Sequence, residues 1–227
     1  MLSAAWIVRR SVSVRGWAVG ERPILFSGEM VRAILDGRKT VTRREVKLPR
    51  ARDSFVLVEH GDGWWPYQSD DGESHVCSDG MERPYNCPYG QPGDQLWVRE
   101  SWCPIYRQGN PELGVIEVDY RATPRERMCD LDGSRRWKPS IHMPRSASRI
   151  QLEVTAVHVE RLQDISEEQA QAEGVSPVRV KVKKLSALVH RAGFFYLWER
   201  INGIGSWDAN PWVWVVEFKV IKGAQHG

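Results

Sequence analysis

The feature that most constrains the fold is a pair of strand patterns in the second half of the chain. Residues 212–221 read WVWVVEFKVI, an almost continuous apolar run that is typical of a buried strand. Residues 149–161 alternate apolar with polar side chains, which predicts a strand with one buried face. No stretch approaches the roughly 18 consecutive apolar residues of a membrane-spanning helix. The two patterns therefore predict a fold built on a β-sheet.

The remaining patterns add short strands and flanking helices. Ser27 can cap a helix that Gly37 ends, and Ser166 with Gln169 forms a capping box for a second helix ending at Glu173 and Gly174. A longer helix is expected at about residues 186–201, with Leu188, Ala192, Phe195 and Trp198 on its buried face. Further strands are expected at residues 23–26, 55–58, 95–100 and 115–120. This order predicts an α+β, β-rich fold, most simply a small β-barrel decorated by insertions.

Length and composition set the class of protein. With 227 residues, 41% hydrophobic and 27% charged, the chain resembles an ordinary globular protein, and collagenous, disordered and membrane-spanning classes are excluded. Residues 1–21 form a short Arg- and Ser-bearing leader without a long apolar core, which we interpret as a poorly ordered extension or as residues upstream of the true start. A single domain is then expected over residues 22–223, in the cytoplasm.

The cysteines do not indicate a disulfide scaffold. Cys77, Cys87, Cys103 and Cys129 are few for a chain of this length, so we expect reduced thiols in a reducing compartment. His75 with Cys77 and Cys87 offers three ligand types in one loop, but the paired spacing of a zinc site and a fourth ligand are missing. We therefore expect no metal and no cofactor.

The basic residues are concentrated in two segments. The net charge of +3 equals the charge of residues 1–20, so the rest of the chain is neutral overall. Within it, residues 32–50 carry seven basic residues against two acids, and residues 121–149 carry eight against three. If these segments meet in space, they would form a local anion-binding face; otherwise they are solvated surfaces.

The order of the short motifs resembles a known family. The signature G-x-K-x-x-x-R is present as Gly37, Lys39 and Arg43, followed by PGDQLWV at 92–98, LEVT at 152–155, residues 165–173 and VEFK at 216–219. This series resembles the ASCH domain family, a branch of the PUA-like superfamily, in its longer form associated with phages and prophages. The resemblance implies a PUA-like small β-barrel with flanking short helices and long insertions at about residues 48–90, 103–147 and 176–210.

The resemblance also implies an activity. Small members of this family that hydrolyse the amide of N(4)-acetylcytidine use a Lys, a Thr and a Glu, which fall here on Lys39, Thr42 and Glu173. The implied enzyme is a metal-independent amidohydrolase. Thr42 would supply a nucleophile or orient water, Lys39 would move a proton or stabilise the oxyanion, and Glu173 would hold a second proton position. The partner would be RNA or a modified cytidine-type nucleoside, and a monomer is favoured.

Other residues are candidates for ligand contacts. Gly37, Arg43 and Arg44 belong to the signature segment, where the arginines can hold phosphate, although Arg44 can instead pair with an acid such as Glu45. Trp137 with His142, Arg145 and Arg149 combines a stacking surface with cations, a combination suited to unpaired bases. Trp97, Trp102, Trp212 and Trp214 are expected in the core or in a pocket wall, where Trp97 in particular can stack on a base.

Two alternatives to the hydrolase remain open. The first is a non-catalytic RNA or modified-base binding module, in which Lys39 and Arg43 contact phosphate and the pocket holds a base without chemistry. The second is a ribonuclease, which ranks lower because the Lys, Thr and Glu lack the obvious His pair for RNA cleavage.

Overall fold

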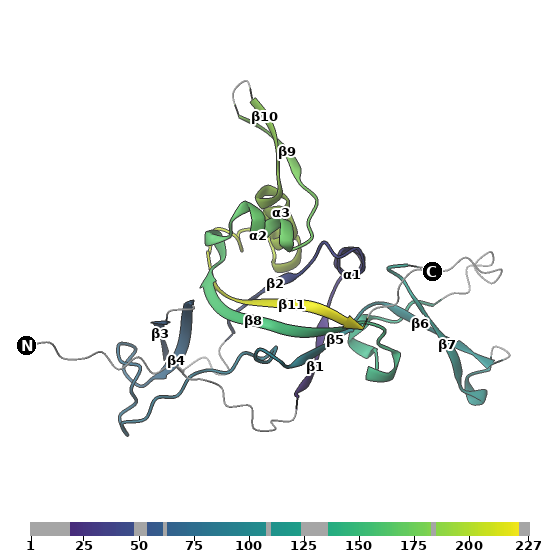
Figure 1. The fold of residues 1–227 in the computed structure, drawn as a ribbon, viewed down its shortest axis with the longest axis horizontal. Coiled ribbons are helices and arrows are strands. Elements are labelled where there is room, and N and C mark those ends of the chain that lie inside the picture. The colour runs from purple at the N-terminus through teal and green to yellow at the C-terminus, as the bar shows by residue number, and fades with distance from the viewer. Residues whose placement is uncertain are drawn as a thin grey trace, which may run out of the picture.

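The fold is known from a computed structural model that describes residues 19–47, 54–60, 63–107, 110–123, 136–182 and 185–222. These residues form a mixed α+β, strand-rich fold (Figure 1). The helices are α1 (Gly28–Leu35), α2 (Glu167–Ala172) and α3 (His190–Asn202). The strands, in chain order, are β1 (Glu21–Leu25), β2 (Val41–Glu45), β3 (Ser54–His60), β4 (Gly63–Ser69), β5 (Gln95–Arg99), β6 (Trp102–Tyr106), β7 (Val115–Tyr120), β8 (Gln151–Arg161), β9 (Val178–Val182), β10 (Leu185–Val189) and β11 (Trp212–Lys222).

The central sheet has the strand order β1-β5-β8-β11-β2. β1 lies parallel to β5, and the other neighbours along this path are antiparallel. The two long strands predicted from the sequence, β8 and β11, pair with each other along most of their length and form the middle of the sheet (Figure 1). β2, which contains Arg43 of the signature motif, is therefore an edge strand of this path.

The first half of β11 is buried on both faces, because its side chains at 213–216 alternate between two hydrophobic clusters. Trp214, Val216 and Phe218 pack in the larger cluster with α1, β1 and β5. Val213 and Val215 pack in a second cluster with α2 and α3. The sheet is thus covered by α1 on one side and by α2 and α3 on the other, which explains why residues 212–218 are almost continuously apolar.

The prediction of an α+β, β-rich fold is confirmed, and the finer prediction of a closed barrel is not. None of the sheets in the described parts of the chain closes on itself, and β1 and β2 remain at opposite ends of the strand order.

The three predicted insertions each contain a β-hairpin. β3 pairs with β4, β6 with β7, and β9 with β10. The first two hairpins lie at opposite ends of the molecule and the third extends beyond α2 and α3 (Figure 1). β4, β6 and β9 were not expected from the sequence, and Pro66 and Pro104 lie within the first two of these strands. Proline is tolerated there because neither strand has neighbours along both edges for its full length.

The helix predicted at 186–201 begins four residues later, at His190. Residues 185–189 instead form β10, and Leu188 is exposed rather than on the buried helix face. α3 has no side-chain cap of its own, and Glu167 of α2 accepts hydrogen bonds from the first backbone amides of α3, including that of Arg191 at 2.9 Å. This cap is tertiary, so local sequence could not place the start of α3. On α3 itself, Phe194 and Trp198 are buried whereas Phe195 and Ala192 are only half-buried.

The predicted leader falls mostly outside the described residues, which begin at residue 19. The last two leader residues belong to the folded part: the Gly20 amide donates to Asp94 Oδ1 at 2.9 Å, and Glu21 pairs with Gln95 in the sheet. In the described part of the chain, no helix is long and apolar enough to cross a membrane.

Candidate functional site

The signature segment turns sharply from α1 into β2. Gly37 has φ +72°, and the amides of Arg38 and Lys39 both donate to the carbonyl of Ala33. This turn places Lys39 beside the end of α2, where it forms an isolated antiparallel bridge with Glu173. Glu173 is the C-cap residue of α2, whose capping box is present as predicted. The turn after α1 and the end of α2 thus bring together two residues 134 positions apart.

The Lys39 ammonium is completely surrounded by acceptors. Its Nζ donates to Glu173 Oε2 at 2.6 Å, to the Val41 carbonyl at 2.7 Å and to the Glu173 carbonyl at 3.0 Å. Lys39 is 1% exposed and Glu173 2%. Burial lowers the pKa of Lys39; the charge and hydrogen bond of Glu173 oppose this effect, and Arg44 and Arg43 add to it. The three protons of the charged amine are all used within the protein.

Arg43 extends this pair into a cluster of four charges. Its Nε donates to Glu160 Oε1 at 2.8 Å, and its Nη1 lies 3.4 Å from Glu173 Oε1. The guanidinium also lies over the ring of Phe194 at 6.0 Å. Burial acts to raise the pKa of Glu160, but hydrogen bonds from His158 and Arg43 and the charge of Arg43 lower it. Two cations, Lys39 and Arg43, thus balance two carboxylates inside the protein.

Gly174 allows Glu173 and Lys39 to approach each other. Its φ is +76°, and a Cβ at this position would lie 2.7 Å from Ala33 Cβ and 2.8 Å from Lys39 Cβ. Only glycine satisfies both the backbone conformation and the close packing of the end of α2 against α1 and the turn before β2.

Glu173 faces a cavity of about 430 Å³ at the free edge of β2, which we call the β2 cavity. Thr42, which is 2% exposed, lines the same cavity. The volume suits a nucleoside-sized ligand. The other lining residues are Met30, Arg43, Arg44, Glu45, Lys47, Pro88, Tyr89, Phe194, Leu197, Trp198, Ile201 and Asn202.

Two buried donors at the β2 cavity lack partners within the described residues. They are Nε1 of Trp198 and Nε of Arg44. Arg44 also donates to the carbonyl of Leu25 at 2.6 Å, which fixes its guanidinium against β1. Burial raises the pKa of Tyr89, with Arg44 acting in the opposite direction, so this phenol stays a donor at neutral pH. The wall therefore offers N–H and O–H groups to a ligand rich in acceptor atoms.

The predicted residues of the signature segment divide into two groups. Lys39, Thr42, Arg43, Arg44 and Glu173 gather at or directly behind the β2 cavity, as the resemblance implied. Gly37 does not belong to it: this residue is exposed and serves the turn after α1.

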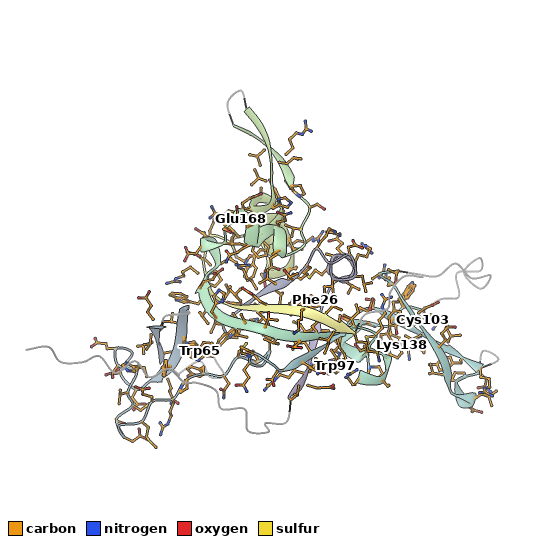
Figure 2. All side chains as sticks on the ribbon, in the orientation of Figure 1. Phe26, Trp65, Trp97, Cys103, Lys138 and Glu168 are labelled. Atoms are coloured by element: carbon orange, nitrogen blue, oxygen red, sulfur yellow. The ribbon has the colours of Figure 1, made fainter. Side chains whose placement is uncertain are left out.

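The second predicted set of ligand residues lies elsewhere. Trp97 is on β5, three strands away from β2 in the sheet order, and the Arg99 guanidinium covers its ring at 5.4 Å (Figure 2). His142 is exposed in a short 3-10 turn, Ser140–His142. None of the residues Trp97, His142, Arg145 and Arg149 lines the β2 cavity, so the structure does not bring them together with the signature segment.

Arg145 and Arg149 have structural partners. Arg145 pairs with Glu21 of β1 at 2.9 Å. Arg149 forms two hydrogen bonds with the buried Glu100, at 2.8 and 3.0 Å, and lies 4.0 Å from the ring centre of Tyr120. Burial raises the pKa of Glu100, against the effect of Arg149. Arg149 therefore holds β5 and the segment before β8 together. Among the tryptophans, Trp102 and Trp214 are buried in hydrophobic clusters as expected, and Trp212 lies under Arg161 at 4.2 Å.

Sequence reasoning missed the residues that the insertions bring to the cavity. Trp198 and Leu197 come from α3, and Pro88 and Tyr89 come from the segment before β5. Glu160, which completes the charge cluster, lies near the end of β8. No local motif marks these positions, because the apolar helix pattern around Trp198 is equally typical of an ordinary core.

The three loop residues considered for a metal do not form a joint site. His75 lies 3.4 Å from Glu82 and packs edge-on against Tyr67. Cys77 and Cys87 are buried, and burial raises the pKa of Cys87 to about 11. Within the described residues, no group of three or more His, Cys, Asp or Glu side chains is arranged to hold a metal ion.

Comparison with known proteins adds nothing to the geometry of the charge cluster and the β2 cavity. No protein-family model, no curated protein and no solved structure matches this chain.

Proposed function

We propose that the chain is an ASCH-type protein with a PUA-like core, and that the β2 cavity is the active site of a metal-independent amidohydrolase. Its substrate would be a cytidine-type base that carries an acyl group on the exocyclic N4. The observation that carries the proposal is the buried contact between Lys39 and Glu173, beside a cavity that Thr42 also lines. The residues that the resemblance implies for catalysis are thus neighbours in space.

One contact between the sheet ends supports a PUA-like core. Arg44 of β2 donates to the carbonyl of Leu25 at the end of β1, and its guanidinium lies 5.5 Å from the ring centre of Phe26. The two edge strands of the central path therefore approach each other through a side chain. This is the approach that closure of a small barrel requires.

The cluster provides a route for a proton. Because burial lowers the pKa of Lys39, a neutral amine is reached more easily than in an exposed lysine, and Glu173 lies 2.6 Å from it. All three protons of the charged amine are donated within the protein, so none is left for a substrate. Lys39 therefore acts on the reaction through Glu173, or by giving up one of these hydrogen bonds in favour of the substrate.

The proposed reaction is acyl transfer to oxygen. The Lys39 amine or the Glu173 carboxylate accepts a proton from the Thr42 hydroxyl or from a water that this hydroxyl orients. The oxygen bonds to the acyl carbon, the C–N bond breaks and the proton passes to the exocyclic nitrogen. The products are cytidine and a carboxylic acid; where Thr42 is the nucleophile, water then hydrolyses its ester.

A second candidate is a binding module that holds the modified base without chemistry. The observation that favours it is the complete use of the Lys39 protons within the protein, an arrangement that can simply fix α2 to β2.

The test is a panel of acylated cytidines incubated with the purified wild-type protein and with Glu173→Gln, with products separated by chromatography. Release of cytidine and acid by the wild type, and its loss in a folded Glu173→Gln protein, supports the amidohydrolase. Circular dichroism establishes folding of the variant. Binding of the same nucleosides without turnover supports the module instead, and neither binding nor turnover contradicts both.

A further inference from the structure

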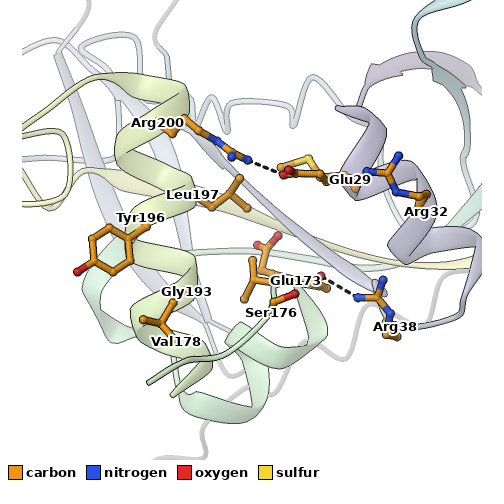
Figure 3. A pocket seen from close by; sticks show the side chains of 13 residues that line it. Glu29, Arg32, Arg38, Glu173, Ser176, Val178, Gly193, Tyr196, Leu197 and Arg200 are labelled. Atoms are coloured by element: carbon orange, nitrogen blue, oxygen red, sulfur yellow. Dashed lines mark hydrogen bonds and ion pairs between the residues drawn. The ribbon is translucent and has the colours of Figure 1, made fainter. Parts of the chain in front are cut away.

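Glu173 lies at the junction of two cavities. It lines the β2 cavity and also a neighbouring cavity of about 450 Å³ between α1 and α3 (Figure 3). Met30 of α1 and Leu197 of α3 are likewise shared by both. The further lining residues of this second cavity include Arg38 and Arg32 on the α1 side and Tyr196 and Arg200 on α3 (Figure 3). The two cavities are therefore parts of one groove.

The groove continues along α1 into a third cavity of about 480 Å³. Glu29, Arg32 and Arg200 line both the second and the third cavity. The third cavity adds Arg121, which follows β7 and is exposed. The three connected cavities form what we call the arginine groove, which runs from Glu173 past Arg38, Arg32 and Arg200 to Arg121.

The two basic segments of the sequence meet in this groove. Arg32 belongs to the first segment, and its Nη1 donates to the carbonyl of Ala122 in the second at 3.0 Å. The meeting point is thus just after the end of β7. Glu173 is already neutralised by Lys39 and Arg43. Arg200 is paired with Glu29, and Arg38 with Asp36 at 2.8 Å, so the positive charge of the groove beyond the β2 cavity comes from Arg32 and Arg121. The balance of the groove is therefore positive.

The groove also holds an exposed aromatic side chain. Tyr196 is 59% exposed on α3, beside the second cavity. A basic track with an exposed ring along it is the arrangement that proteins use for unpaired nucleic-acid strands, since guanidinium groups follow the phosphates and a base stacks on the ring.

We propose that the arginine groove binds the phosphodiester backbone of a single nucleic-acid strand whose modified base enters the β2 cavity. The substrate of the proposed amidohydrolase would then be a nucleotide within a strand and not a free nucleoside. This inference rests on the proposed function for the choice of base, but the binding of the strand itself does not require turnover.

The test is fluorescence anisotropy with a short, labelled, unmodified strand, as RNA and as DNA, over a series of salt concentrations. The variants are Arg121→Gln, Arg200→Gln and Tyr196→Leu. The matched control is Arg145→Gln, because Arg145 and Arg200 are both partly exposed arginines paired with a partly exposed glutamate, and Arg145 does not line the groove.

Replacing a groove arginine that contacts a phosphate should weaken binding by about threefold or more. It should also reduce the slope of log affinity against log salt concentration by about 0.7. Tyr196→Leu should weaken binding by about fivefold or more with the slope unchanged, because stacking carries no charge. Arg145→Gln should bind as the wild type does. If one of the two nucleic acids binds more tightly, the groove is assigned to that nucleic acid. If RNA and DNA bind equally, the groove recognises the phosphodiester groups that both contain.

Failure of the inference and failure of the proposed function are distinguishable. If the wild type does not bind either strand, or if the groove variants bind as tightly as Arg145→Gln, the inference is wrong even where acylated nucleosides are hydrolysed. If the groove variants lose binding and no acylated cytidine is hydrolysed, the inference that the groove binds a strand is supported and the proposed amidohydrolase activity is wrong.

Discussion

Lys39 Nζ donates a hydrogen bond of 2.6 Å to Glu173 Oε2, with both side chains buried and 134 residues apart in the chain. A buried ion pair needs compensation for the hydration that both groups lose. Here the compensation comes from two backbone carbonyls on the lysine side and from Arg43 on the glutamate side. The pair therefore joins the end of α2 to the turn before β2 and holds one wall of the β2 cavity.

The first prediction concerns the stability of this pair. Lys39→Met removes the charge and keeps a similar length, and it leaves the buried carboxylate of Glu173 with only the more distant Arg43. We expect the free energy of unfolding to fall by about 3 kcal/mol or more. The control is Lys219→Met on β11, because Lys219 pairs with Glu153 at 2.8 Å in solvent and its loss should cost under about 1 kcal/mol. Urea unfolding measures both, and equal losses would contradict a stabilising role for the buried pair.

The second prediction concerns pH. Burial lowers the pKa of Lys39 in the folded protein, whereas the unfolded chain keeps the ordinary value of 10.5. Between these two values the unfolded state binds more protons, so this group makes the free energy of unfolding rise with pH, by at most about 1.4 kcal/mol per pH unit.

The measurement is urea unfolding of the wild type and of Lys39→Met at neutral pH and in alkaline steps up to 10.5. The difference in stability between the two proteins should grow as the pH rises, because other titrating groups are common to both. A difference that shrinks with pH would show that the pKa of Lys39 is raised, and the proton route proposed through a neutral amine would then be wrong.

The third prediction concerns the glycine beside the pair. Gly174→Ala and Gly37→Ala both place a side chain at positive φ, which costs about 1–2 kcal/mol. At Gly174 the new Cβ also collides with Ala33 and Lys39, whereas at Gly37 no atom lies within 4 Å. Overpacking should therefore make Gly174→Ala less stable than Gly37→Ala by a further 1–3 kcal/mol, approximately. Thermal and urea unfolding compare the two variants, and equal stabilities would show that Gly174 is not tightly packed against Ala33 and Lys39.

Local patterns predicted the elements that make up the middle of the sheet and the first part of the site. The alternation at 149–161 and the apolar run at 212–221 correspond to β8 and β11, and Ser27, Gly37 and the Ser166–Gln169 box mark the helix ends as expected. These signals are local: each depends on residues a few positions apart.

The parts that were not predicted depend on contacts between distant segments. The start of α3 is fixed by Glu167 of α2, and Pro66 and Pro104 are tolerated because their strands are not fully enclosed by neighbours. Contacts between distant segments also explain why part of the site was not predicted. The signature segment and Glu173 were identified through a resemblance, but Glu160, Tyr89 and Trp198 reach the cavity through tertiary packing and carry no local signal.

The two basic segments, residues 32–50 and 121–149, were predicted in part. Their charge pattern correctly suggested two segments that can meet, and they do meet where Arg32 contacts Ala122. Arg145 and Arg149, which the sequence offered as ligand contacts, instead pair with Glu21 and Glu100. Sequence shows how many charges a segment carries, whereas the pairing of each charge depends on the fold.

The central claim is that Thr42 takes part in hydrolysis of an N(4)-acylated cytidine in the β2 cavity. The most direct measurement is kcat/KM for N(4)-acetylcytidine, free and within a short strand, for the wild type, Thr42→Val and Thr40→Val. Thr40 is the control because it makes the same substitution two residues away, on an exposed side chain that does not line the β2 cavity, whereas Thr42 is buried. We predict a loss of about 100-fold or more for Thr42→Val and a rate close to that of the wild type for Thr40→Val. An inert wild type, or a Thr42→Val protein that retains the wild-type rate, would contradict the claim.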